Sequence, residues 1–317
     1  MPAEPTKRIH FERVCDISLE ELFPLVRERR LFRRWGVQPV PDTAANVVDE
    51  MRRHYIRLRE LFMQLYTEGA LRPRAVYGLF PCWSEGESLI VFASDEAAAP
   101  AHSLISPTTA ESYVRFHFPS RRVADNMKSP SLSTTLGAQS ERTNLAASAA
   151  ASAAPTVPAP PAASLAAYFA SREEACARGR FDVFPAQVVS VGAGILEYAN
   201  GLYAQGEYRD YFLVHGLAAE LTEVLAAYIF QQACKDLDER FPLSAAGMAA
   251  GERASSVRRY SFGYPACPDL AQNGLLLRLL GAERIGVTES EIGEMLPELS
   301  TSAFIVRRRN ALVHKSL

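Results

Sequence analysis

The segment Arg259-Tyr-Ser-Phe-Gly-Tyr-Pro-Ala-Cys-Pro268 carries the most specific signal in this chain. Gly263 lets the backbone turn and lets another molecule approach closely, because glycine has no Cβ. Tyr264 adds an aromatic face and a hydroxyl group, and the proline after it restricts the backbone. Together these residues predict a rigid turn with a half-buried tyrosine, which is also the kind of turn that a ligand site needs.

Around this turn, helices and strands are mixed without a regular alternation. Runs of β-prone apolar residues predict strands at residues 75–81, 88–93, 181–191 and 301–306. Apolar residues at three- and four-residue spacing predict helices within residues 14–69, 217–229 and 271–280. Pro81 is expected at a strand end or a sheet edge, and Glu220 on the polar side of its helix. The fold class that follows is α+β with a mainly antiparallel sheet.

Residues 122–163 differ in composition from the rest of the chain. They are rich in alanine, serine and proline, and they have almost no large apolar side chains to bury. Such a segment cannot offset the entropy of ordering, so it is predicted to be a flexible surface insertion. The expected organisation is an N-terminal part of one domain at 1–121, the insertion at 122–163, and the C-terminal part at 164–317.

Composition narrows the class of protein. The 317 residues are 48% hydrophobic, which is enough for a packed core, and the net charge of -2 makes a nucleic acid a poor candidate partner. The five cysteines form no Cys-x-x-Cys pair, which favours reduced thiols over a zinc site or a disulfide framework. Neither a secretory signal nor a run of about 20 apolar residues is visible, so no membrane is expected and the location is predicted to be cytoplasmic.

Three groups of segments, in order along the chain, resemble the reactivation domain of cobalamin-dependent methionine synthase. They are residues 71–81; residues 181–192 with 206–211 and 215–223; and residues 259–269 with 283–288 and 299–303. The Gly-Tyr-Pro-Ala-Cys-Pro block is the most specific of these matches. The resemblance implies a C-shaped α+β domain with a twisted antiparallel sheet, carrying S-adenosylmethionine in a groove.

The function implied by the resemblance is reactivation of an oxidised cobalamin carried by a partner chain. Flavodoxin or an equivalent reductase would supply an electron, and S-adenosylmethionine would methylate the reduced cobalt. The sequence has no Asp-x-His-x-x-Gly motif for a cobalt ligand, no cysteine cluster for zinc, and no room for a folate barrel of about 250 residues. The chain is therefore not expected to make methionine alone.

The same resemblance assigns five residues to S-adenosylmethionine. Arg259 would grip the carboxylate of the ligand, and Glu223 would accept hydrogen bonds from its amino or ribose groups. The backbone of Ser261, the turn at Gly263 and the ring of Tyr264 would complete the contacts. The simpler alternatives are a surface arginine, a solvated glutamate and a turn without a ligand.

Two positions depart from the family pattern. Arg27 aligns with an aspartate that contacts the amino group of the ligand, although the neighbouring Glu28 could substitute for it, and Ile305 replaces a tyrosine found in some relatives. These departures motivate an alternative hypothesis, in which the chain is a non-catalytic relic that binds a corrinoid protein without using S-adenosylmethionine. A self-sufficient methyltransferase is disfavoured, because Gly192-Ala-Gly194 lacks the continuation of a dinucleotide-binding glycine loop.

Overall fold

Two long apolar strands form the centre of the sheet in the computed structural model, which describes residues 9–37, 45–98, 113–120, 164–242 and 257–307. They are β2 (Arg74–Glu85) and β5 (Asp182–Ser190), whose side chains are almost all buried because helices cover both faces. The seven-stranded sheet has the order β4-β3-β2-β5-β9-β6, and β1 also pairs with β2. The remaining strands are β1 (Phe11–Asp16), β3 (Ser88–Phe92), β4 (Tyr113–His117), β6 (Val257–Tyr260) and β9 (Ser300–Arg307).

All pairs in this sheet are antiparallel, which confirms the predicted α+β class. The N-terminal strands β1 to β4 and the C-terminal strands β5, β6 and β9 build one sheet. The predicted insertion at 122–163 lies outside the described residues.

Pro81 lies within the central strand β2, at a position where the neighbouring strand on one side is missing. The prediction that Pro81 ends its strand is wrong, because β2 continues to Glu85 and Pro81 pairs with Val183 of β5. On the other side of β2, however, pairing with β1 ends at Leu79 and pairing with β3 begins at Cys82. Proline has no N–H to donate, so it is tolerated at this change of partner strand.

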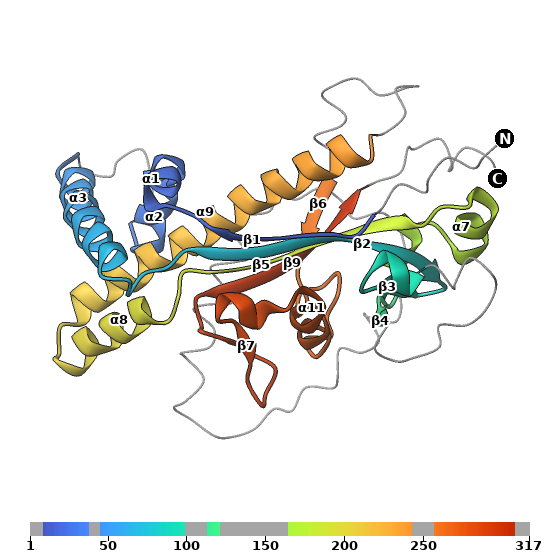
Figure 1. The fold of residues 1–317 in the computed structure, drawn as a ribbon. Helices are drawn as coiled ribbons and strands as arrows, with labels where there is room; N and C mark the ends of the chain where they lie inside the picture. The colour runs from blue at the N-terminus through green and yellow to red at the C-terminus, as the bar shows by residue number, and fades with distance from the viewer. Residues whose placement is uncertain (1–8, 38–44, 99–112, 121–163, 243–256, 308–317) are drawn as a thin grey trace.

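Helices pack on both faces of the sheet (Figure 1). The long helix α9 (Tyr208–Arg240) lies on one face with α8 (Gly194–Ala204), and alternate β2 residues such as Ala75 and Tyr77 point into that core. The opposite face is covered by α11 (Gln272–Leu280), against which Val76 and Phe80 pack. The other elements are α1 (Leu19–Leu22), η1 (Phe23–Leu25), α2 (Glu28–Arg34), α3 (Ala45–Thr67), α4 (Asp95–Ala98), η3 (Leu165–Tyr168), α7 (Arg172–Arg178), η4 (Ala282–Ile285), β7 (Thr288–Glu289) and β8 (Met295–Leu296).

Helix α9 is long and apolar enough to cross a membrane by length and composition. Its most apolar window is 67% buried inside the fold, however, against the sheet and the neighbouring helices. The apolar character of α9 is therefore accounted for by its place in the core.

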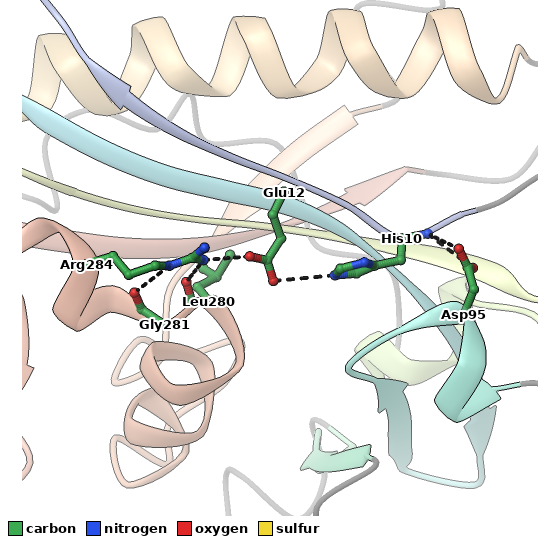
Figure 2. Close-up of polar contacts among 6 residues, drawn as sticks. All are labelled: His10, Glu12, Asp95, Leu280, Gly281 and Arg284. Atoms are coloured by element: carbon green, nitrogen blue, oxygen red, sulfur yellow. Dashed lines mark hydrogen bonds and ion pairs between the residues drawn. The ribbon is translucent and has the colours of Figure 1, made fainter.

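Polar contacts connect the edge strand β1 and the residue before it to η4 on one side and to α4 on the other (Figure 2). Glu12 accepts a hydrogen bond of 2.6 Å from Arg284 of η4 and lies 3.4 Å from the ring of His10, whose backbone N–H donates to Asp95. Burial raises the pKa of Glu12, but the contacts with His10 and Arg284 outweigh it and hold that pKa below its ordinary value. These contacts stabilise β1, which was not predicted as a strand separate from the helical region after it.

The approach of α2 to α9 depends on a glycine in the N-terminal third of α9. Trp35, at the C-terminal end of α2, is buried and donates a hydrogen bond of 3.1 Å from Nε1 to the backbone oxygen of Leu213. A Cβ at Gly216 would lie 2.6 Å from that same Nε1 atom. Only glycine therefore lets the indole ring pack against the helix without a shift.

Gly216→Ala is expected to destabilise the protein by about 1–2 kcal/mol, because overpacking of a buried contact exceeds the gain in helix propensity. Gly201→Ala in α8 is the matched control, since a Cβ there meets nothing within 4 Å. It should stabilise the protein by about 0.5–1 kcal/mol. Urea unfolding of both variants checks this, and equal shifts would show that Trp35 adapts freely.

Candidate functional site

The motif segment forms a tight turn that projects from the end of β6. The backbone N–H of Gly263 donates to the oxygen of Cys267 over 2.9 Å, and the N–H of Cys267 donates to the oxygen of Tyr264 over 2.9 Å. Gly263 has a φ of 86°, a value that side chains with a Cβ rarely adopt. The glycine is thus required by the turn itself, and the tip of the turn is exposed.

Buried side chains fix this turn to the sheet. The ring of Phe262 is 4% exposed and packs on Phe116, Phe118 and Phe304 with centroid distances of 5.5, 6.0 and 5.2 Å. Ser261 donates from Oγ to the backbone oxygen of Ser302 over 2.7 Å. The aromatic cluster therefore holds the root of the turn while its tip faces solvent.

Cys267 closes the turn as a buried thiol. Its Sγ atom lies 2.8 Å from the backbone oxygen of Ser261, and burial raises the pKa of the thiol to about 12. A thiol with so high a pKa is not a nucleophile at neutral pH. The structure agrees with the interpretation of Cys267 as a packing residue.

Arg259 points from β6 toward α9. It pairs across the sheet with Ile305 of β9, so the two side chains share the face that packs on α9. Its Nη2 atom lies 3.6 Å from the carboxylate of Glu223. Ile305 is fully buried in the core, so this residue is part of the floor under Arg259 and not an exposed wall of a groove.

Tyr264 lies in the electrostatic field of the same pair. Its side chain at the exposed tip of the turn is 40% exposed. Partial burial raises the pKa of its hydroxyl, the negative charge of Glu223 raises it further, and Arg259 opposes both. The fold thus brings together Arg259, Glu223 and Tyr264, and it places Ser261 and Gly263 in the backbone that connects them.

A second ion-pair cluster adjoins this group. Glu220, one turn before Glu223 on α9, is 1% exposed and faces two arginines of α2. The Arg30 Nε atom lies 3.1 Å and the Arg34 Nε atom 3.5 Å from the Glu220 carboxylate. Arg30 also reaches Glu223, with 3.5 Å between its Nη2 atom and the carboxylate oxygen. We call Arg30, Arg34, Glu220, Glu223 and Arg259 the arginine–glutamate cluster.

The expectation that Glu220 lies on the polar side of its helix is wrong, and it was missed as a candidate site residue. Its burial depends on Arg30 and Arg34, which come from a helix far away in the sequence. The only local signal was its spacing of three residues from Glu223, which places both carboxylates on one face of α9.

The prediction about Arg27 needs a related correction. Arg27 is the residue that precedes α2, and its side chain is exposed. The arginine of this helix that faces the site is Arg30, three residues later. Within α2, the positive charge beside Glu223 therefore belongs to Arg30 and not to Arg27.

Stability is expected to depend on pH through Glu220. Burial raises the pKa of Glu220, and Arg30 and Arg34 offset this only in part. In the unfolded chain the group ionises near 4.5, before it ionises in the folded protein, so its contribution to stability falls as the pH rises through the folded pKa. Glu220→Gln should therefore gain stability relative to the parent protein as the pH rises from about 4 to 7.

Glu12→Gln is the matched control with the opposite sign. The pKa of Glu12 is lowered in the folded protein, so its contribution is present above about pH 4.5 and is lost as the pH falls. Relative to the parent protein, this variant should lose stability over the same rise in pH. Urea unfolding at several pH values measures both differences. Identical pH profiles for the two variants would contradict the assignment.

A cavity and a metal site are the other kinds of functional feature that could lie among the described residues. A cavity of about 320 Å³ lies elsewhere, among residues of α7, β5, the end of α9 and β9, and none of the cluster residues lines it. Within the described ranges, no three His, Cys, Asp or Glu side chains gather as a metal site.

Comparisons with known proteins agree with the fold and the motif. The family "Vitamin B12 dependent methionine synthase, activation domain" matches residues 154–315. Methionine synthase of Mycobacterium tuberculosis is 33% identical over 313 residues, covering 94% of this chain and 22% of that protein. Methionine synthase of Mycobacterium leprae is 30% identical over 289 residues, covering 88% and 20%.

A solved structure supports the architecture. The crystal structure of the MetH reactivation domain bound to AdoHcy matches with a TM-score of 0.65 and 18% identity, covering 98% of this chain and 82% of that one. At this identity the match establishes the fold. The chain spans about a fifth of the length of the mycobacterial methionine synthases that it matches.

Proposed function

The chain belongs to the family of vitamin B12-dependent methionine synthase activation domains, and from this membership we propose that it binds S-adenosylmethionine to reactivate an oxidised cobalamin. The observation that carries the proposal is the pair of Arg259 on β6 and Glu223 on α9, 3.6 Å apart, which interacts electrostatically with Tyr264 on the motif turn. A related fold that holds AdoHcy, the demethylated form of this ligand, supports the choice of ligand.

The residues present fit the polar groups of S-adenosylmethionine. The planar guanidinium of Arg259 matches the carboxylate of the ligand, and Glu223 can accept from its amino or ribose groups. Tyr264 offers a ring beside the nucleoside, and the glycine at 263 leaves the backbone of the turn open to close approach. The backbone of Ser261, fixed by its contacts with Ser302 and Cys267, would contact the ligand at the root of the turn.

The chemistry proposed for the ligand is donation of its sulfonium methyl group to cobalamin after one-electron reduction. The protein contributes binding, orientation and electrostatics to this reaction. We propose a cobalamin-binding methionine synthase module as the partner and flavodoxin or an equivalent reductase as the electron donor. We also propose a cytoplasmic location, and one domain formed by residues 1–121 and 164–317 with an insertion between them.

Calorimetric titration of the intact chain with S-adenosylmethionine tests the proposal directly. Saturable binding with a stoichiometry near one is the expected result, and its absence would contradict the proposal. A second assay follows methylation of an oxidised cobalamin module in the presence of a reductase. Binding to the module without any response to S-adenosylmethionine would favour the alternative, a non-catalytic interaction module.

A further inference from the structure

The carboxylate of Glu223 is already close to two guanidinium groups. Its oxygen Oε2 lies 3.5 Å from Arg30 on α2 and 3.6 Å from Arg259 on β6. These are electrostatic contacts, since the Nη2 atom of Arg30 is buried and makes no aligned hydrogen bond. An ammonium group arriving at Glu223 would therefore meet a carboxylate whose charge is partly neutralised.

Arg30 is held in this position by a buried carboxylate. Its Nε atom lies 3.1 Å from Glu220, which is 1% exposed, and Arg34 approaches Glu220 from one turn further along α2. The side chain of Arg30 is itself 35% exposed, so it has an open side toward solvent. Its contacts with the two carboxylates involve different nitrogen atoms, Nε for Glu220 and Nη2 for Glu223.

The arginine–glutamate cluster contains more positive than negative groups. Three guanidinium groups, those of Arg30, Arg34 and Arg259, face the two carboxylates of Glu220 and Glu223. A surplus positive charge favours the carboxylate of an amino-acid ligand and opposes its ammonium and sulfonium groups.

We propose that Arg30 is a specificity-determining residue, a built-in cation that competes with the amino group of the ligand for Glu223. The inference rests on the proposed function and adds to it the residue that sets how strongly the amino group is recognised. In this view Glu220 positions Arg30, and ligand binding moves Arg30 away from Glu223.

Titration of the Arg30→Gln variant tests this. It should bind S-adenosylmethionine about 3- to 10-fold more tightly than the parent protein, because Glu223 is released from a partly exposed pair. A double variant, Arg30→Gln with Glu220→Gln, should show the same gain in affinity for S-adenosylmethionine. It also removes the buried carboxylate of Glu220, which would otherwise lose one of its two arginine partners. Arg27→Gln is the control, since it removes the same charge from an exposed position of the same segment.

A second ligand separates competition from a general change in the fold. The amino group of the ligand should contribute more to affinity in Arg30→Gln than in the parent protein. The ratio of the dissociation constants of S-adenosylhomocysteine without its amino group and of intact S-adenosylhomocysteine should therefore be about 3- to 10-fold larger for the variant. Equal binding of S-adenosylmethionine by the parent protein and both Arg30 variants would overturn the competition, and weaker binding by both variants would overturn it and make Arg30 a residue that holds the ligand. Absence of binding by all proteins would instead overturn the proposed function, and this inference with it.

Discussion

Arg259→Ala is expected to weaken binding of S-adenosylmethionine by about 10- to 150-fold, the loss of a hydrogen bond between charged groups. Arg259 lies on the short edge strand β6, and its partner residue on β9, Ile305, is fully buried. This pairing fixes the backbone from which the guanidinium group extends. Its planar fork can hold a carboxylate through two parallel hydrogen bonds, which alanine cannot replace. Calorimetric titration of the parent protein and the variant gives the ratio of the two dissociation constants.

Arg258→Ala is the matched control for this prediction. The neighbouring arginine pairs with Val306, so its side chain lies on the opposite face of the sheet, and its removal changes the net charge equally. A second control is 5′-methylthioadenosine, a ligand without the carboxylate, which should bind the parent protein and Arg259→Ala alike. A comparable loss for Arg258→Ala would show that Arg259 acts through general charge. A comparable loss for the ligand without the carboxylate would show that Arg259 maintains the shape of the site and does not contact the carboxylate.

The periodic parts of the fold could be predicted from the sequence because local patterns determine them. The apolar stripe from Leu217 to Ile229 predicted a helix, and it lies inside α9. The β-prone run at 181–191 predicted a strand, and it became β5. By contrast β1 went unnoticed, because half of its residues Phe11–Asp16 are charged, they do not alternate regularly with apolar ones, and the segment gains its strand structure from pairing with β2.

The candidate site also has one part that could be predicted from local sequence and one part that could not. The motif turn could be predicted because Gly263 and Cys267 contact each other within a few residues. The arginine–glutamate cluster could not, because burial of Glu220 is tolerable only beside arginines that the tertiary fold brings from α2. The sequence suggested Arg27 as the arginine near the ligand, but the direction in which α2 presents its side chains makes Arg30 the residue that faces Glu223.

Phe262→Ala is expected to destabilise the protein by about 3–5 kcal/mol, the usual cost of truncating a buried aromatic ring. The ring is almost fully buried and contacts aromatic rings from β4 and β9 as well as Phe118, so its removal leaves a cavity where the root of the turn meets the sheet. Urea unfolding measures the loss. A milder variant, Phe262→Leu, keeps much of the volume and allows ligand binding to be measured on a folded protein.

Tyr264→Ala, two residues further on, should give the opposite result. Its side chain is 40% exposed at the tip of the turn, so the change in stability should stay below about 0.5 kcal/mol. Binding of S-adenosylmethionine should weaken by about 2- to 10-fold, because the nucleoside loses an aromatic contact. A large loss of stability for Tyr264→Ala, or none for Phe262→Ala, would contradict the division of the turn into a buried root and an exposed binding tip. The division explains why one short segment needs both residues: the buried ring holds the turn rigid, and a rigid turn loses less conformational entropy when a ligand binds at its tip.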